Sequence, residues 1–434
     1  MGGCGFCPPW PLKIFVGVIA AVFLLHREAL SRDITESIEQ TLFGGIANPF
    51  RVQVDGNDLL SAEPGQFGTP ITAMTFQSVG GLLRNELFSE VSIVPVTSGS
   101  TGFVYTYNEL VGVFERTPIG LGTIFNERAN TAGRRGLAVG VSFIRQDFAE
   151  FNGEDVSALR IRSGLFARPQ PLGTFLDNGS VEALLDLDVT TDTFALWTTY
   201  GVTEWLDVNL ILPLTRIDFR ARSTIKAKLL TEPLPAFLTD AEGNISDFVV
   251  FPQGTEITLP GGAKVATNTV AEEKFGIADI VLRGKARWGE GTWGTWGMLV
   301  EMTFPTGNED NFLGDGALKG RLLALYSRSF YNGRINFHLN GGVKVTSETT
   351  RKYTVEYGST LDIRVTDRLS IIAEPIGFWR MDPQGLPDNF ADGAFGFKAN
   401  LWRGLVLVAT WRIPYTADGL RSDIIYTAGL EYDL

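Results

Sequence analysis

Apolar and polar residues alternate along most of the chain from Gly136 to its C-terminal end. Between residues 294 and 305, for example, Trp296, Met298, Val300 and Met302 occupy every second position. Alternation over about ten residues is typical of strands with lipid on one face and a polar interior on the other. The pattern predicts twelve strands, at residues 136–147, 183–201, 204–219, 276–288, 294–305, 317–330, 334–346, 352–365, 368–380, 391–402, 404–413 and 422–434.

The connections between these strands alternate between short and long. Short ones fall at residues 202–203, 289–293, 331–333, 366–367 and 403, and long ones at 148–182, 220–275, 306–316, 347–351, 381–390 and 414–421. Short periplasmic turns opposite longer external loops are typical of a transmembrane barrel. We therefore expect an all-β, antiparallel transmembrane β-barrel of about 12 strands. An even strand count places the N- and C-termini together on the short-turn, periplasmic side.

Aromatic residues gather beside the short turns. They are Trp205, Trp288, Trp293, Trp296, Phe330, Tyr331, Trp402 and Tyr432. Amphipathic rings prefer the headgroup level of a bilayer, so this placement indicates a periplasmic aromatic girdle. The alternative is a soluble β-sandwich with aromatic ends, which would not need strands of lipid height.

One apolar run lies near the N-terminus, from Ile14 to Leu25, behind Lys13 and ahead of Ala29-Leu30-Ser31. Its length suits a secretory signal better than a membrane helix, which needs about 20 residues. We expect residues 1–31 to be a signal peptide, with a short membrane anchor as the alternative. Cys4 and Cys7 leave with it, so the mature chain has no thiolate chemistry and no disulfide.

Residues 32–135 form an extension ahead of the predicted barrel. Within it, Phe76, Val79, Leu83, Leu87 and Val91 recur at spacings of three and four, which predicts an amphipathic helix over 75–94. Residues 102–117 favour a hairpin. The segment 75–128 either folds into the lumen as a plug or packs outside the barrel mouth on the periplasmic side, and the barrel proper occupies 136–434.

The chain carries a formal net charge of −12. Phosphate repels such a surface, so nucleic acid is not an expected partner. The expected partners are outer-membrane lipid and a small-molecule solute. Because the predicted fold is a transmembrane β-barrel, we expect the protein to be located in the bacterial outer membrane.

Charged residues fall at positions that the alternation assigns to the lumen. Arg283, Lys285 and Arg287 share one strand face. The other candidates are Glu301, His338, Glu356, Asp362, Arg364 and Arg412. They form either a charged constriction that selects solutes or a network of ion pairs that closes a narrow interior.

Two features bear on other chemistry. His338 is the one histidine expected in the mature chain, and without a nucleophile near it in sequence it favours a structural role. Glu309, Asp310 and Asp315 lie in a glycine-containing loop, but their spacing does not fit an EF-hand, and solvation explains them better than Ca²⁺. We therefore expect no metal, no cofactor, no catalytic residue and no enzymatic activity.

The last strand carries an assembly signal. Thr427, Gly429, Tyr432 and Leu434 give polar-x-Gly-x-x-aromatic-x-hydrophobic at the C-terminal end. This pattern resembles the one read by the outer-membrane barrel assembly machinery, although Leu434 replaces the commoner terminal Phe or Trp.

Several stretches resemble the transporter-like outer-membrane barrel family labelled MetA-pathway of phenol degradation. They are GFVYTY at 102–107, GVFER at 112–116, FNERA at 125–129, TAGR at 131–134, FNGED at 151–155, DIVLRGK at 279–285 and FPTG at 304–307. The resemblance implies uptake of aromatic or other apolar small molecules and identifies no catalytic residues.

The leading functional hypothesis is an outer-membrane channel or transporter for small, apolar or aromatic molecules, with passive or plug-gated passage. One alternative is a non-conducting structural barrel whose loops bind a surface partner. A second is a lipid-acting barrel hydrolase, which would depend on His338.

Overall fold

A computed structural model describes the backbone of residues 33–38, 51–54, 57–60, 91, 97–99, 105–108, 113–116, 120–163, 181–227, 234–239, 245–251, 256–258, 265–347, 353–381, 389–402 and 404–434. The predicted signal peptide lies outside these residues, as does most of the predicted helix at 75–94, of which Val91 alone is described; it is helical and buried. Among the described residues, no helix is long and apolar enough to cross a membrane.

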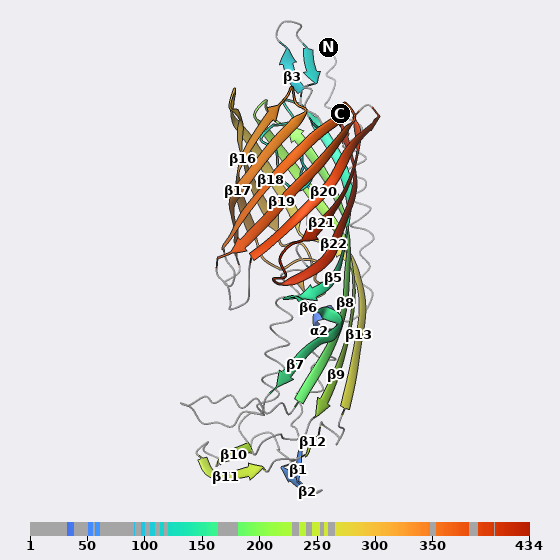
Figure 1. The fold of residues 1–434 in the computed structure, drawn as a ribbon, viewed down its shortest axis with the longest axis vertical. Coiled ribbons are helices and arrows are strands. Elements are labelled where there is room, and N and C mark those ends of the chain that lie inside the picture. Colours follow the sequence, from blue (N-terminus) through green and yellow to red (C-terminus); the bar gives the residue numbers. More distant parts are fainter. Residues whose placement is uncertain are drawn as a thin grey trace, which may run out of the picture. The chain divides into compact units, whose positions relative to one another are not determined.

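Within this part of the chain, twelve antiparallel wall elements close into a barrel (Figure 1). They are β5 (Leu137–Phe151), β8 (Val181–Gly201), β9 (Leu206–Ala227), β13 (Val265–Ile277) with β14 (Ile280–Gly291), β15 (Gly294–Phe304), β16 (Lys319–Phe330), β17 (Ile335–Thr346), β18 (Tyr353–Thr366), β19 (Leu369–Arg380), β20 (Asn389–Trp402), β21 (Leu405–Pro414) and β22 (Leu420–Asp433). Pairing of β22 with β5 closes the sheet, for example at Tyr432↔Val139. The predicted fold class is confirmed.

β13 and β14 count as one wall element because both pair with the long strand β9. β14 pairs with β9 residues 206–211 and β13 with residues 214–226. Residues 220–275 were predicted to be a loop, and this is wrong at both ends, since β9 continues to Ala227 and β13 begins at Val265. The alternation continues there, but its charged residues point outward.

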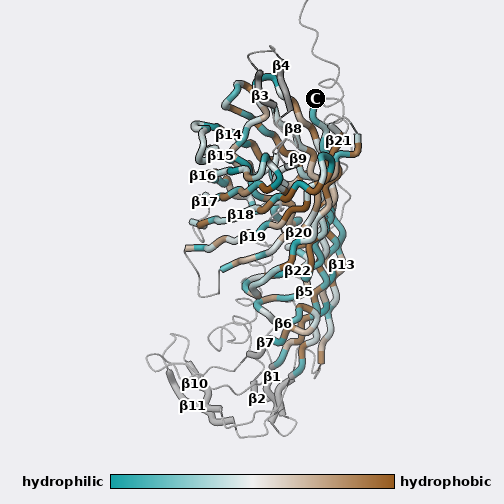
Figure 2. Tube along the Cα trace, turned by 45° about the horizontal axis from the view of Figure 1, so that its top comes forward, coloured by the Kyte–Doolittle hydropathy of each residue, from teal (hydrophilic) through white to brown (hydrophobic). Residues whose placement is uncertain are grey.

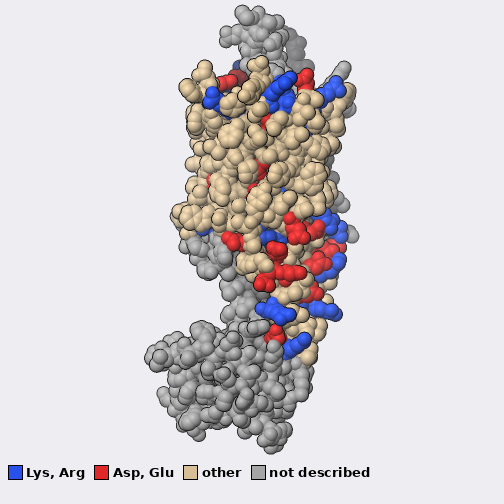
Figure 3. Space-filling view, viewed as in Figure 1, with Lys and Arg blue, Asp and Glu red and all other residues tan. Residues whose placement is uncertain are grey.

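Along the membrane-height part of the strands, apolar side chains face outward and polar ones inward. Figure 2 shows hydrophobic and hydrophilic residues following one another along the traces of these strands. On β15, Val300 and Met302 are exposed while Thr295 and Glu301 are buried. Apolar atoms exposed on a barrel wall have no favourable partner in water, whereas lipid tails accommodate them. The outer surface is therefore built to face lipid, and Figure 3 shows that this belt carries few charged side chains.

The polarity of both faces changes along β8 and β9. From the short turn up to Leu214, apolar residues such as Val208 and Phe194 are exposed on the outside. Further along the same strands, Asp188, Arg216 and Arg220 take the outward positions. Since charged side chains do not face hydrocarbon at this density, the lipid boundary crosses β9 between Leu214 and Arg216. Beyond it, β7 (Leu159–Ser163), β8, β9 and β13 form a sheet extension on the loop side.

The inward face of the sheet extension carries an apolar core instead of the polar lumen. Phe219 packs edge-on against Phe312 with ring centroids 6.0 Å apart. Ile34 of the short helix α2 (Ile34–Ser37) joins the same cluster. The hydroxyl of Thr35 donates to the carbonyl of Asp310 in the 3-10 turn η5 (Glu309–Asn311) at 2.9 Å. The sheet extension is therefore a folded continuation of the barrel wall whose outer face is exposed to water.

Exposed aromatic residues mark both edges of the apolar belt. All eight residues of the predicted girdle are exposed. A second set at the loop-side strand ends was not predicted and consists of Tyr353, Trp379, Trp411 and Tyr415. On β18 the outward face runs from Tyr353 to Val365, which projects to roughly 30 Å at about 3.3 Å per residue and a tilt of about 40°. This matches the hydrocarbon thickness of about 30 Å.

Several smaller elements are not among the twelve wall elements. β3 (Tyr105–Asn108) pairs with β4 (Val113–Arg116), as predicted for the hairpin at 102–117. β1 (Arg51–Val54) pairs with β2 (Asn57–Leu60) and β12 (Glu256–Thr258), and β10 (Leu234–Thr239) with β11 (Ile245–Phe251). β6 (Glu154–Asp155) and the 3-10 turn η3 (Val156–Ala158) follow β5.

Candidate functional site

Two stretches of the N-terminal extension lie inside the barrel, against the inward-facing side chains of its wall. We call residues 97–99 and 120–132 the luminal segment. Nearly all of it is buried, and Thr123 and Ala129 have no exposed surface. The segment is neither helix nor strand, so its backbone amides need acceptors from elsewhere.

The wall supplies those acceptors on β18 and β19. The backbone N–H of Leu121 donates to the Ser370 hydroxyl at 3.0 Å, and that of Gly122 donates to the Asp362 carboxylate at 3.1 Å. The carboxylate of Glu374 accepts from two successive amides, Ile124 at 2.9 Å and Phe125 at 2.7 Å. Inward-facing carboxylates therefore bind main chain here and are not aimed at an open lumen.

The same arrangement continues around the barrel. Asn340 on β17 both accepts from the Glu127 amide at 2.6 Å and donates to the Glu127 carbonyl at 2.7 Å. Ser327 on β16 accepts from the Ala129 amide at 2.9 Å. Asp207 on β9 accepts from the Ala132 amide at 2.8 Å. Paired donors and acceptors from five strands thus fix the path of residues 121–132.

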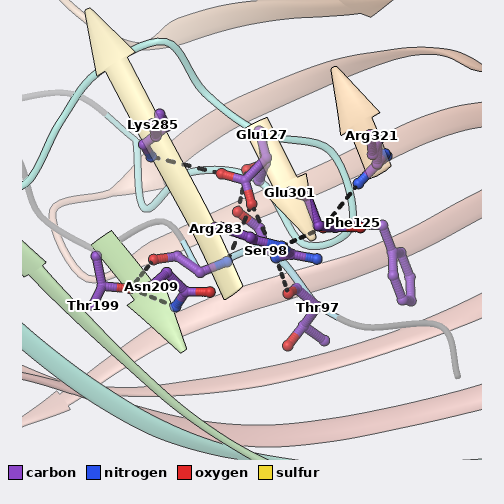
Figure 4. Close-up of polar contacts among 12 residues, drawn as sticks. Thr97, Ser98, Phe125, Glu127, Thr199, Asn209, Arg283, Lys285, Glu301 and Arg321 are labelled. Atoms are coloured by element: carbon purple, nitrogen blue, oxygen red, sulfur yellow. Dashed lines mark hydrogen bonds and ion pairs between the residues drawn. The ribbon is translucent and has the colours of Figure 1, made fainter. Parts of the chain in front are cut away.

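The charged centre of the lumen is built around Glu127 of the luminal segment (Figure 4). Its carboxylate lies 3.4 Å from Arg283 Nη1 and 3.6 Å from Lys285 Nζ. Arg283 also donates through Nε to Glu301 at 2.5 Å. Arg321 lies 3.4 Å from Glu301 and bonds Glu356. Three wall cations and three carboxylates therefore neutralise one another, which is how buried charges become tolerable.

Residues 97–99 join this centre from the other side. Arg283 donates to the Thr97 carbonyl at 3.2 Å, and Thr97 and Ser142 on β5 share a hydroxyl–hydroxyl hydrogen bond of 3.0 Å. The Gly99 amide donates to Glu127 at 3.2 Å, and the Gly99 carbonyl accepts from Thr199 at 2.6 Å. Both stretches of the luminal segment are therefore held by one connected network.

The structure brings together several of the predicted lumen residues and separates others. Arg283, Lys285, Glu301 and Glu356 meet in the charged centre. Asp362 binds the luminal segment outside that centre. Two of the arginines lie apart from it.

Arg287 pairs with Glu290 beside the β14–β15 turn, and Arg364 pairs with Asp367 beside the β18–β19 turn. Both therefore belong to the short-turn rim. Arg412 lies towards the opposite end, where it donates to Asp392 at 2.6 Å.

Sequence reasoning missed the residues that hold the luminal segment. Glu374 and Asn340 stood at inward positions of predicted strands, and that alternation was the signal for them. Glu127 had no such alternation. The sequence left its segment, 75–128, either in the lumen or outside the barrel mouth, and the structure places Glu127 in the lumen.

His338 has a nucleophile-type neighbour after all, on the adjacent strand. The Ser327 hydroxyl lies 2.7 Å from His338 Nδ1, and both residues are buried. The sequence argument considered only the strand that contains His338 and therefore missed the serine on the adjacent strand. The pair faces inward beneath Ala129, whereas a hydrolase of membrane lipids would have to reach the outer surface.

The acidic loop at 306–316 has ordinary contacts. Asp315 accepts from the Ala317 amide at 3.2 Å and pairs with Lys319, while Glu309 and Asp310 are exposed on η5. No group of three metal-ligating side chains occurs within the described residues.

The four residues of the predicted assembly signal lie on β22 or directly after it. Thr427 and Gly429 face inward, while Tyr432 and Leu434 are exposed on the outer surface. The exposed pair is the part of the motif that another protein can contact.

Comparisons with known proteins give no family assignment. No family model matches the chain, and no curated protein does. The resemblance to the phenol-degradation family therefore rests on its sequence motifs alone.

Solved structures with some similarity include the COG4313 outer membrane channel from Pseudomonas putida F1, with a TM-score of 0.43 and 13% identity over 71% of this chain and 99% of that one. The Ralstonia pickettii toluene transporter TbuX gives 0.33 and 8%, over 70% and 92%. A Pseudomonas aeruginosa FadL homologue gives 0.29 and 10%, over 69% and 89%.

Proposed function

We propose that this chain is an outer-membrane channel or transporter in which the luminal segment gates the passive passage of small molecules. The observation that carries the proposal is the binding of residues 97–99 and 120–132 to the inward side chains of the wall by the hydrogen bonds described above. An element of the N-terminal extension occupies the place where a solute would pass.

The chemistry of the contact favours a removable element. Each neutral hydrogen bond contributes only about 0.5–1.5 kcal/mol net, because water replaces the partner when the bond opens. Polar wall groups such as Asn340, Ser370 and Asp362 stay satisfied by water when the segment leaves. A lumen filled only by apolar side chains would gain nothing from hydration. Since the segment lies ahead of β5 in the chain, it can move without breaking the barrel wall.

The charged centre is the proposed selectivity element. If Glu127 moves away with the luminal segment, Arg283 and Lys285 lose one carboxylate while the wall keeps Glu301 and Glu356. Arg128 of the luminal segment, which is 1% exposed, moves with Glu127, so the net charge of the path stays the same while the surroundings of Arg283 and Lys285 become more positive. The resemblance noted in the sequence supports small apolar or aromatic molecules as the solutes.

Location and partners belong to the same proposal. The apolar belt and its two aromatic edges support outer-membrane lipid as the surroundings, with the C-terminal end of β22 on the periplasmic side where the turns are short. The N-terminal end was expected on that side too, but α2, which begins three residues after the expected signal peptide, packs against η5 on the loop side. The exposed Tyr432 and Leu434 support recognition of β22 by the barrel assembly machinery.

The alternatives differ from this proposal in measurable ways. A structural barrel keeps the luminal segment in place permanently and does not conduct. A lipid hydrolase requires His338, and activity that survives His338→Ala would exclude it. The buried, inward position of the Ser327–His338 pair favours a role in holding Ala129.

The test is planar-bilayer conductance of residues 32–434 compared with a version that begins at residue 133. We expect small or rare steps from the longer chain and large, frequent steps from the shorter one. A chain starting at residue 97 serves as the control, because it keeps both luminal stretches. Silence from all three, with folded barrels verified by circular dichroism, would overturn the proposal in favour of the structural barrel.

A further inference from the structure

A small cavity opens near the loop-side end of the barrel, where β19 to β22 meet β5. Its empty volume is about 470 Å³, including the open space at its mouth. Apolar side chains of Phe148, Phe378 and Leu420 line part of it. Asp392, Arg412, Arg421 and Ser422 line the rest. Arg412 and Arg421 flank the connection from β21 to β22, so the cavity lies away from the charged centre around Glu127.

An irregularity in β22 turns two polar residues into this cavity together. The register between β22 and β5 shifts at Arg421/Ser422 and again between Ser422 and Ile425. As a result Leu420, Arg421 and Ser422 are all buried, although successive residues of a regular strand point to opposite faces. β-Bulges that redirect side chains are common near functional sites.

The cations in the cavity wall outnumber the acids. Asp392 is the single carboxylate among the lining residues, and it accepts from Arg412 Nε at 2.6 Å and also from Arg421. One carboxylate compensates one guanidinium, so the lining keeps one positive charge. A bound monoanion would bring the charge of the lining to zero.

Aromatic rings hold Arg421 and Arg412 in place. The Arg421 guanidinium lies 5.0 Å from the ring centre of Phe390, which stacks on Phe378 with centroids 4.4 Å apart and an angle of 13°. Arg412 lies 5.6 Å from the ring centre of Phe125 in the luminal segment. The cavity therefore borders the element proposed to move.

Two buried polar atoms of the lining lack a hydrogen-bond partner among the described residues. They are Arg421 Nε and the Ser422 hydroxyl oxygen. Arg421 and Ser422 are 8% and 6% exposed. A buried donor without an acceptor is costly, at about 1–3 kcal/mol. A ligand carboxylate at this place would accept from both.

We propose that this cavity binds a small aromatic monocarboxylate. The carboxylate would accept hydrogen bonds from Arg421 Nε and the Ser422 hydroxyl. The ring would lie against Phe148, Phe378 and Leu420. The inference rests on the proposed function, because it names the solute class that reaches the lumen, and it places the binding step beside Phe125.

The test is calorimetric titration of the detergent-solubilised chain 32–434 with benzoate, acetate and benzylammonium. We expect saturable binding of benzoate, weaker binding of acetate because it has no ring, and no binding of benzylammonium because its charge is wrong. Arg421→Gln should weaken benzoate binding about tenfold or more, since it removes a charged donor. Ser422→Ala should weaken it severalfold, and Arg364→Gln at the opposite rim should leave it unchanged.

The outcomes separate this inference from the proposed function. Equal binding of benzoate and benzylammonium, or benzoate affinity unchanged in both Arg421→Gln and Ser422→Ala, would overturn the site. Should Arg421→Gln fail to fold, the result with Ser422→Ala decides. Benzoate binding in a barrel that never conducts would support the site and overturn the transport proposal, while conduction without benzoate binding would do the reverse.

Discussion

Replacing Glu374 by alanine should loosen the luminal segment more than any other single change in the wall of β19. The Glu374 carboxylate accepts from the amides of Ile124 and Phe125 at 2.9 and 2.7 Å and from the Thr360 hydroxyl at 2.9 Å. Hydrogen bonds to a charged group contribute about 1.5–3 kcal/mol each. Taking the lower value for the two amide bonds, because water can fill the space left, the bound segment loses about 3 kcal/mol.

That loss corresponds to an increase of roughly 150-fold in the population with the segment displaced. The assay is the rate at which a small methanethiosulfonate reagent labels a cysteine placed at Thr123, which is fully buried in the closed barrel. Residues 32–434 contain no other cysteine. When displacement and return are fast, the labelling rate follows the displaced population.

Three variants in the Thr123→Cys background make the comparison. Glu374→Ala should label about 100-fold faster than the parent, in line with the estimate above. Glu374→Gln, which keeps a carbonyl acceptor, should fall between them. Glu290→Ala removes an exposed carboxylate at a short turn and should label like the parent. Equal rates for Glu374→Ala and Glu290→Ala would refute the assignment of Glu374 as the principal anchor.

Three further predictions follow from the same structure. Val300→Arg places a charge on the lipid-facing wall and should lower the unfolding free energy in lipid vesicles by about 2–4 kcal/mol. Arg220→Ala on the sheet extension should lower it by less than about 1 kcal/mol. Equal losses for the two variants in urea titrations would contradict the lipid boundary on β9. Lys285→Gln should shift the reversal potential of the open barrel in a salt gradient towards cation selectivity, and an unshifted potential would exclude Lys285 from the path. The control is Arg328→Gln, because the Arg328 guanidinium lies at the short-turn rim, 5.0 Å from the ring centre of Phe330. The buried carboxylate of Asp279, between β13 and β14, accepts from the Gly307 amide at 3.0 Å. Asp279→Ala should therefore lower the unfolding free energy by about 1–3 kcal/mol in urea titrations, and an unchanged free energy would count against this contact.

The barrel could be predicted from the sequence because the side of the wall that each residue faces shows directly in whether that residue is apolar or polar. Outward residues such as Val300 meet lipid and inward residues such as Glu301 do not, so alternation alone locates the strands. The same rule failed at residues 220–275, because Arg216 and Arg220 carry the alternation into water, where charge replaces the apolar face. The alternation persisted there, but charged residues faced outward and apolar residues inward, the reverse of the arrangement in the membrane.

The lumen was less predictable because its contacts join residues far apart in the chain. Alternation placed Arg283 and Glu301 inward, but their partner Glu127 comes from an irregular segment with no period. Arg287 shares a strand face with Arg283, yet it lies at the turn, where Glu290 pairs with it. At the β22 bulge, strict alternation assigns Arg421 and Ser422 to opposite faces, whereas both are buried.

The central claim, that the luminal segment moves to open a path, is tested most directly by a reversible lock. The side-chain oxygens of Thr97 and Ser142 lie 3.0 Å apart, close enough for a Thr97→Cys/Ser142→Cys pair to form a disulfide between the segment and β5. Planar-bilayer recordings would follow the oxidised protein before and after reduction, with each single cysteine variant as control. We predict that oxidation suppresses conductance and that reduction restores it. Equal conductance of the verified disulfide form and its reduced form would contradict the claim.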